Sequence, residues 1–288
     1  MRKLVVLVLV ALGLLLVTPA IASASTPTLK SLATSLAALQ KQVARQRVQI
    51  AVLNRKLAKA RSLLALAPYL SVTQAALNGV AGPNIVFHGC NVHVMSSTSE
   101  TDGSGLGNLI VGWDHEPYGT LPSPFRSGSN NLVCGNRNNF TGAGGFVAGL
   151  ANAVSGLYSS VSGGSQGGAT GPEASVSGGY GNAASAIFSS VSGGSANWAS
   201  AQCASIAGGQ INIASGEASS ILGGQENNAT GNSSTVGGGN LNSASGDACS
   251  ILGGDGNNAK GNSSTVGGGH DLIDSSGLFL AEGSLQAN

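Results

Sequence analysis

The sequence predicts a mainly β protein: a parallel β-roll or β-solenoid of about ten 15-residue coils, preceded by an N-terminal coiled-coil helix. Two patterns carry this prediction. A 15-residue unit recurs from residue 160 to residue 266 without a change of spacing, and apolar residues recur at heptad spacing from residue 29 to residue 64. Glycine is abundant (45 residues) and aromatic residues make up only 4% of the chain, so each coil has little apolar volume. We therefore expect several chains to associate and bury more of it.

The first 24 residues have the features of a secretory signal peptide. Arg2 and Lys3 precede an apolar run from Leu4 to Val17, and small residues then offer cleavage sites after Ala22 or Ala24. The run is short for a membrane span of about 20 residues, so an uncleaved anchor is the weaker alternative. The sequence thus predicts a secreted protein, extracellular or at the cell surface.

A coiled-coil stalk is predicted over residues 25–66. Apolar side chains fill nearly every first and fourth heptad position, and Gln46 is a polar exception that would help to fix register and strand number. The first positions are Leu29, Leu36, Val43, Ile50, Leu57 and Leu64, and the fourth are Leu32, Leu39, Gln46, Leu53 and Ala60. An amphipathic helix packed on a globular core is the alternative.

Charge is divided between the stalk and the remainder of the chain. Residues 25–70 hold eight basic and no acidic residues, whereas residues 71–288 hold three basic and all 12 acidic residues, a formal balance of −9. Like charges along a coiled coil repel unless an anionic surface or salt screens them. The simplest interpretation is a solvated basic face; the functional hypothesis is that the stalk contacts anionic envelope polymer or lipid headgroups. Binding to purified envelope that did not change with salt would contradict this expectation.

A neck is predicted between the stalk and the repeats, over residues 67–107. Pro68 ends the heptads, and residues 84–95 are expected to form a strand that covers the first coil. The longest departure from the repeat is the insertion at residues 113–129, which contains three prolines.

Insertions on solenoids form loops on one face and often carry recognition. The aromatic residues Trp113, Tyr118 and Phe125 of the insertion are therefore the candidate binding patch. The alternative is that they anchor the loop.

The repeat unit reads Ser/Thr, Val/Ile, x, Gly, Gly, x, x, Asn, x, Ala, Ser/Thr, Gly and three variable residues. It is too short for a helical pair or a propeller blade, which need roughly 33 to 50 residues. It suits one solenoid coil with two short strands. The second and eighth positions define the repeat: Val161, Val176, Val191, Ile206, Ile221, Val236, Ile251 and Val266 at the second, and Asn182, Asn197, Asn212, Asn227, Asn242 and Asn257 at the eighth.

Each coil is expected to bury its Val/Ile and its Ala while Ser and Thr face outward, because side chains alternate along a strand. Gly-Gly and Asn-rich corners should supply positive φ angles where the chain turns. Coils stacked about 4.8 Å apart would align the Asn side chains into an internal hydrogen-bonded ladder. Weaker copies of the unit place the start of the head near residue 108; the head is predicted to span residues 108–274, with a tail at 275–288.

No catalytic, cofactor-binding or metal-binding constellation is predicted. His88 and His93 would point to opposite faces of a strand, and His115 beside Asp114 and Glu116 is only a weak cluster. His270 falls at a variable repeat position. The acidic residues of the head recur at no common place in the unit, and the Gly-Gly pair matches neither a phosphate-binding loop nor the nine-residue calcium-binding repeat.

The four cysteines permit three pairings. Cys203 and Cys249 would lie about 14 Å apart along the stack, beyond the reach of a disulfide. A Cys90–Cys134 bond remains possible, and small buried thiols are the alternative for all four.

Two phrases carry a family resemblance: Ser-Ser-Val-Ser-Gly-Gly at residues 159–164 and 189–194, and Asn-Ser-Ser-Thr-Val-Gly-Gly-Gly at 232–239 and 262–269. They resemble the head repeats of trimeric autotransporter adhesins. This resemblance implies a left-handed parallel β-roll, association of three chains, and a non-catalytic adhesive head on a stalk. The implied partners are a host or neighbouring-cell surface protein or glycan, and no nucleic acid.

The resemblance covers residues 145–274 well and 108–144 loosely. Here the coiled coil precedes the head, whereas the family usually places heads before stalks. The C-terminus is too short for the membrane anchor of the family, so retention at the surface would depend on the stalk, the signal segment or another protein.

A structural or adhesive rod is therefore the leading prediction, and three alternatives remain. A phage-type fibre would share the trimeric build, although a signal peptide argues against it. An ice- or crystal-binding face would use the hydroxyl row at the eleventh repeat position, which Lys260 interrupts. A glycan-cleaving solenoid enzyme is the third.

Overall fold

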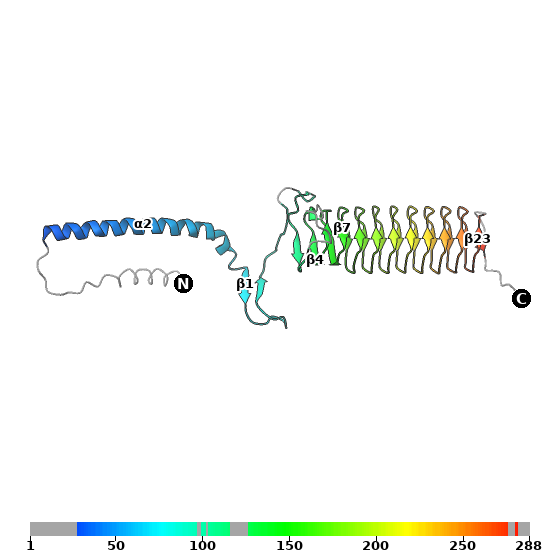
Figure 1. Ribbon diagram of the computed structural model, residues 1–288, viewed down its shortest axis with the longest axis horizontal. Coiled ribbons are helices and arrows are strands. Elements are labelled where there is room, and N and C mark those ends of the chain that lie inside the picture. Colours follow the sequence, from blue (N-terminus) through cyan, green and yellow to red (C-terminus); the bar gives the residue numbers. More distant parts are fainter. Residues whose placement is uncertain (1–27, 97–98, 102, 116–125, 276–279, 282–288) are drawn as a thin grey trace. The chain divides into compact units, whose positions relative to one another are not determined.

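A computed structural model describes residues 28–96, 99–101, 103–115, 126–275 and 280–281 of the chain (Figure 1). The predicted signal peptide lies outside the described residues. The chain divides into two compact units, Met1–Asn91 and Val92–Asn288, and each is considered by itself.

The first unit contains the long helix α2, Leu29–Ala65, which confirms the predicted N-terminal helix. It begins after Thr28, whose carbonyl oxygen accepts a hydrogen bond from the Ser31 amide at 2.9 Å. Its 37 residues give a length of about 55 Å. The large apolar heptad side chains from Leu29 to Leu57 are exposed in the single chain, with Leu36 at 58% and Leu53 at 62%. Among the described residues, no helix combines the length and apolar character needed to cross a membrane.

An antiparallel hairpin follows the helix. Strand β1, Leu70–Thr73, pairs with β2, Asn84–Phe87. Between them the chain turns at Asn78 and Gly79, which both have positive φ angles of 50° and 80°. Asn-Gly with two positive φ angles is typical of the type I′ turn, whose twist matches that of paired strands.

The hairpin corrects the predicted strand over residues 84–95. Only residues 84–87 form a strand, and they pair with β1 inside the first unit. The predicted strand was too long because the pairing with β1 ends at Phe87, opposite Leu70, the first residue of β1.

The second unit is a parallel β-solenoid with two sheets, as predicted (Figure 1). One sheet has 12 strands and the other 10, and nearly every coil contributes one strand to each. The first sheet contains β3 Leu109–Val111, β4 Leu132–Asn136, β6 Phe146–Leu150, β8 Ser160–Val161, β10 Ser175–Val176, β12 Ser190–Val191, β14 Ser205–Ile206, β16 Ser220–Ile221, β18 Thr235–Val236, β20 Ser250–Ile251, β22 Thr265–Val266 and β24 Leu280–Ala281.

The second sheet runs beside it in the same order. It contains β5 Asn139–Phe140, β7 Ala153–Val154, β9 Gly168–Ala169, β11 Ala183–Ala184, β13 Trp198–Ala199, β15 Ile213–Ala214, β17 Asn228–Ala229, β19 Ser243–Ala244, β21 Asn258–Ala259 and β23 Ile273–Asp274. Register follows the repeat directly: Val176 pairs with Val161 on one side and with Val191 on the other.

The array continues beyond the predicted end of the head at residue 274. Strand β24 pairs in parallel with β22, and Leu280 lies opposite Thr265 at the same 15-residue step. The sequence did not show this strand because Leu280 and Ala281 depart from the Ser/Thr-Val/Ile pattern, whereas the backbone pairing needs only an extended strand.

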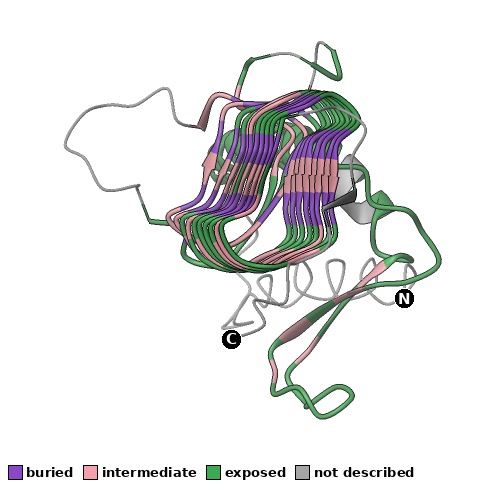
Figure 2. Cartoon of the chain, turned by 90° about the vertical axis from the view of Figure 1, so that its right-hand side faces the viewer, coloured by how far each residue is buried: buried purple, intermediate pink, exposed green. Residues whose placement is uncertain are grey.

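The core repeats coil by coil (Figure 2). The Val/Ile of each second position and the Ala of each tenth position are almost completely buried, at 0–1% exposure from Val161 to Val266. The residue before each Ser/Thr is also small and buried; Ala174, Ser189 and Cys249 are examples. Seen along the stack, the buried positions lie over one another in successive coils (Figure 2).

The recurring Asn side chains form the expected internal ladder. Asn212 is fully buried, and its amide N–H donates to Oδ1 of Asn197 at 3.0 Å. Its own Oδ1 accepts from the Asn227 amide at 3.0 Å, while its Nδ2 donates to the carbonyl oxygens of Gly208 and Gly224, both at 3.0 Å. Every polar atom of this side chain is therefore satisfied without water.

The corners differ from the prediction. The second glycine of each Gly-Gly pair does have a positive φ, but the Asn residues do not supply the other turns. Those turns occur at the seventh and fourteenth positions, where bulky residues such as Ile211 (φ 55°) and Phe188 (φ 58°) adopt left-handed conformations. The Asn side chains instead form the hydrogen bonds of the ladder. These corner positions vary in sequence, so the repeat pattern alone does not mark them.

The ladder is interrupted once, at Gly167. Its amide donates a hydrogen bond to Oδ1 of Asn152 at 2.7 Å, so Gly167 is hydrogen-bonded to the ladder residue of the preceding coil. Having no side chain, Gly167 cannot accept a hydrogen bond from the Asn182 amide on the other side.

Replacing Gly167 by Asn is expected to raise the stability of the head by about 1–2 kcal/mol, because it completes the ladder and restricts the unfolded chain. A Cβ at this position would lie 3.3–3.5 Å from side-chain atoms of Asn152, Val161 and Val176, which leaves room for the new side chain after small adjustments. Thermal unfolding followed by circular dichroism measures the effect, at roughly 2–4 °C per kcal/mol.

Gly168→Asn is the matched control. A Cβ on Gly168 meets nothing within 4 Å, and Asn228 and Asn258 occupy the same outward position in later coils. This variant restricts the unfolded chain in the same way but gains no ladder contact, so it should raise the midpoint less than Gly167→Asn does. A midpoint for Gly167→Asn at or below that of the control would contradict the prediction.

Candidate binding site at the insertion

Only one residue of the predicted aromatic patch lies in the described part of the chain. Trp113 is 87% exposed, and its ring stacks on that of His115 with centroids 5.7 Å apart and an interplanar angle of 27°. Tyr118 and Phe125 lie outside the described residues. An indole this exposed is free to contact a partner.

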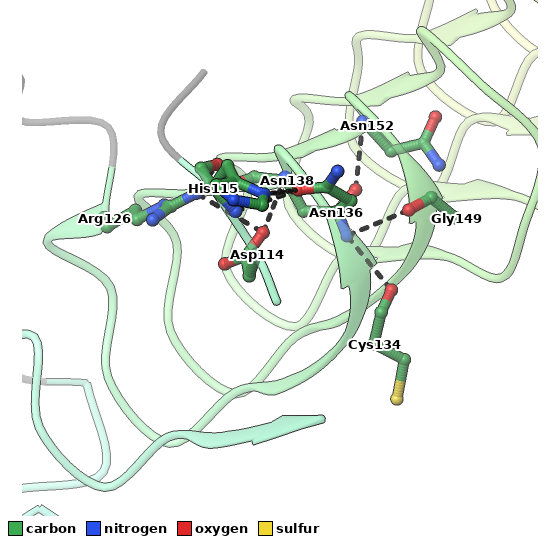
Figure 3. A network of polar contacts seen from close by, with 8 residues as sticks. All are labelled: Asp114, His115, Arg126, Cys134, Asn136, Asn138, Gly149 and Asn152. Atoms are coloured by element: carbon green, nitrogen blue, oxygen red, sulfur yellow. Dashed lines mark hydrogen bonds and ion pairs between the residues drawn. The ribbon is translucent and has the colours of Figure 1, made fainter. Parts of the chain in front are cut away.

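Asp114 takes the place of an Asn at the N-terminal end of the ladder (Figure 3). It is only 8% exposed, and its Oδ1 accepts a hydrogen bond from the Asn138 amide at 2.9 Å. One coil further on, Oδ1 of Asn138 accepts from the Asn152 amide at 3.1 Å in the same way. Asp114 is therefore the cap of the ladder.

Arg126, at the other end of the insertion, forms an ion pair with the cap residue Asp114. Its guanidinium lies 3.3 Å from Oδ1 of Asp114 and donates to the carbonyl oxygens of His115 at 2.6 Å and Asn138 at 3.2 Å. The Arg126 guanidinium carbon also lies 6.0 Å from the centre of the Phe140 ring. Since buried carboxylates need a charged or hydrogen-bonding partner, this ion pair fixes both ends of the insertion on the first coils.

His115 has a similar structural role. Its amide donates to Oδ1 of Asn136 at 2.8 Å, and its ring Nδ1 lies 3.2 Å from the same oxygen (Figure 3). The weak cluster noted around Asp114, His115 and Glu116 thus divides into two anchoring residues and one residue outside the described segment. Within the described ranges, no three His, Cys, Asp or Glu side chains are grouped so that they could hold a metal ion.

No family model matches this chain, and a search of curated proteins also finds no match.

The four cysteines are free thiols in this structure. Cys90 and Cys134 belong to different units, so the possible disulfide between them stays a prediction. Cys90 and Cys203 are exposed, and Cys134 is half-buried. Cys249 is buried in the small-residue position of its coil, and this burial raises the pKa of its thiol. A buried, protonated thiol is a poor nucleophile, which is consistent with a packing role.

Two groups of side chains were missed because only stacking brings them together. His270 lies between two carboxylates, with Nδ1 3.1 Å from Asp255 and Nε2 3.1 Å from Asp271. Tyr158 and Phe188 occupy the same corner position two coils apart. In both cases a comparison of residues 15 or 30 positions apart would have found them.

Proposed function

We propose that this protein is a secreted or surface-exposed, non-catalytic rod with an adhesin-like role, in which three chains present the repeat head on a coiled-coil stalk. The observation that supports it best is the uninterrupted stack from β8 to β22, in which successive coils pair in parallel and in register. Such a stack provides a long, regular surface on which groups are presented outward.

A trimeric stalk is supported by the heptad side chains of α2. Those from Leu29 to Leu57 include large apolar side chains that are exposed in the single chain, so association would bury apolar surface that otherwise faces water. The basic residues of the helix fall outside the first and fourth heptad positions, where they would remain solvated in a coiled coil. In this proposal they also contact an anionic envelope polymer.

The proposed partner of the head is a protein or glycan on a host or neighbouring cell. No cofactor, metal ion or nucleic acid takes part in this role. The acidic balance of residues 71–288 disfavours nucleic acid, because phosphate backbones are bound through clusters of Lys and Arg.

The native mass of the protein tests the proposal. We expect light scattering after size-exclusion chromatography to give about three times the chain mass, both for the mature protein and for a form lacking residues 25–66. A trimer in both means that the head itself associates. A stable monomer in both would rule out the trimeric rod and make the solenoid a self-sufficient single chain.

A further inference from the structure

One corner of the solenoid, at the first coils of the regular repeat, carries large apolar side chains where later coils do not. We call it the aromatic corner and define it as Leu157, Tyr158, Pro172, Glu173, Ile187 and Phe188, the thirteenth and fourteenth positions of three successive coils. The same positions in the five following coils hold Gln202, Cys203, Glu217, Ala218, Asn232, Ser233, Asp247, Ala248, Asn262 and Ser263. The fold therefore accepts small or polar residues at this corner.

The two rings of the aromatic corner do not contribute to the core. Tyr158 is 47% exposed and Phe188 is 48% exposed. Both have left-handed backbone conformations, with φ of 56° and 58°, which are unfavourable for bulky residues. Exposed rings at strained positions weaken the fold slightly, so their presence points to a contact with something else.

The coils hold these rings at a fixed separation. The Glu173 amide donates to the Leu157 carbonyl at 2.7 Å, and the Phe188 amide donates to the Pro172 carbonyl at 3.1 Å. Two coil steps place Tyr158 and Phe188 about 10 Å apart along the stack. Two rings in one line at this distance form a platform about as long as two linked pyranose rings.

Tyr158 also borders an open cavity of ≈ 420 Å³. Its ring lies against Gly144, where an added Cβ would come within 2.7–2.8 Å of two ring carbons. Met95, Ser96, Glu100 and Asn130 line the cavity beside it.

The polar wall of this cavity is fixed by Asn130. Its Oδ1 accepts from the Ser96 amide at 2.6 Å, and its Nδ2 donates to the Glu100 carbonyl at 3.0 Å. The cavity and the aromatic corner thus form one surface with apolar rings, hydroxyl groups and carboxylates.

The charges on this surface limit what it can bind. Glu173 occupies the corner position of the coil between those of Tyr158 and Phe188, and Glu100 lines the cavity. Two copies meeting antiparallel through this corner would bring their Glu173 carboxylates together, which disfavours a symmetric contact between copies. Anionic ligands are disfavoured for the same reason.

We propose that the aromatic corner and its adjoining cavity bind a neutral glycan. Pyranose rings have an apolar C–H face that stacks on aromatic rings, and hydroxyl groups at the edge that donate to carboxylates. Tyr158 and Phe188 supply the stacking faces, and Glu173 and Glu100 accept hydrogen bonds from the hydroxyl groups. This inference deepens the proposed adhesive function, on which it rests, by naming the ligand class and its site.

Isothermal titration of the full chain with oligosaccharides tests the proposal. Cellohexaose and the N-acetylglucosamine hexamer are the neutral probes, and an oligogalacturonate hexamer is the anionic probe. We expect at least one neutral hexamer to bind at least tenfold more tightly than the anionic one. The double variant Tyr158→Ser/Phe188→Ser should weaken this binding at least tenfold.

Serine is chosen because Ser233 and Ser263 already occupy this corner position, so the double variant should unfold at the same temperature or higher. Trp198→Asn is the matched control: Trp198 is 50% exposed but belongs to β13, and Asn228 and Asn258 take its place in later coils. This control should bind like the wild type.

No binding of either neutral hexamer, equal binding of the anionic one, or unchanged binding by the double variant would each overturn the glycan site. A protein ligand that depended on the two rings, without saccharide binding, would also overturn it. None of these results affects the native mass, and adhesion that persisted in the double variant would leave the proposed function intact.

Discussion

Asn212→Asp is expected to lower the thermal unfolding midpoint of the head by about 10 °C at pH 7. The substitution keeps the size of the side chain but replaces the two Nδ2 donors with an anionic oxygen. That oxygen would face the carbonyl oxygens of Gly208 and Gly224 inside a fully buried ladder. A buried charge opposed by two acceptors costs roughly 3 kcal/mol or more, and each kcal/mol shifts the midpoint by about 2–4 °C.

The loss of stability caused by Asn212→Asp should become smaller as the pH is lowered. Burial and the facing carbonyl oxygens raise the pKa of the new carboxyl in the folded state above its unfolded value of about 3.9. Well below that pH the carboxyl is protonated in both states, so the charge penalty disappears, and at pH 4 little of it remains. The penalty grows as the pH rises from about 4 toward the higher folded-state pKa, and it is constant above that. Unfolding at pH 4 and pH 7 measures the difference.

Asn232→Asp is the matched control for this prediction. Asn232 is exposed, and its Oδ1 accepts a hydrogen bond from the Glu217 amide at 3.1 Å. Asp247 performs the same task one coil later, since its Oδ1 accepts from the Asn232 amide at 3.0 Å. The same chemical change should therefore alter the midpoint by no more than about 2 °C here. Equal effects of the two substitutions would show that the ladder is not what holds the coils together.

Gly209→Ala is expected to disrupt at least two coils. Gly209 has a φ of 88°, where an L side chain is strained, and an added Cβ would fall on the carbonyl oxygen of Gly224 in the next coil. It would also lie 2.6 Å from Nδ2 of Asn212. The clash is with backbone, which cannot rotate away, so the cost is about 3 kcal/mol or more. Hydrogen exchange followed by mass spectrometry should show faster exchange in the coils on both sides.

The neighbouring substitution Gly208→Ala is the control. It shows whether the effect of Gly209→Ala comes from the clash with the next coil or from the replacement of a glycine by alanine as such. A Cβ at Gly208 meets no atom within 4 Å, and its φ lies outside the left-handed region. Alanine should therefore be neutral or stabilise the head by about 0.4–1 kcal/mol, because it restricts the unfolded chain. Equal unfolding midpoints for the two alanine variants would contradict the close approach of successive coils at the second glycine.

The solenoid was predictable because stacking in register places residues 15 positions apart in contact. A residue type that recurs at that period, such as the buried Val/Ile or the ladder Asn, must therefore have the same environment in every coil. The inward positions and the ladder followed from this period alone. The N-terminal helix followed from its heptads in the same way.

The candidate site was less predictable, because it lies where the repeat is broken. The insertion had no period, so the sequence did not show that Asp114 replaces a ladder Asn or that Arg126 pairs with it. The aromatic corner was missed because Tyr158 and Phe188 are isolated in sequence and become neighbours only through the stack.

The coil length, the residues that face inward and the long helix can be read from the amino-acid sequence, since each of these follows from a local period. The partner of β2, the cap at Asp114 and the positions that take left-handed conformations became visible only in the folded chain. These features depend on which backbone groups remain unpaired once the coils have stacked. That is a property of the whole assembly of strands, and no single stretch of residues contains it.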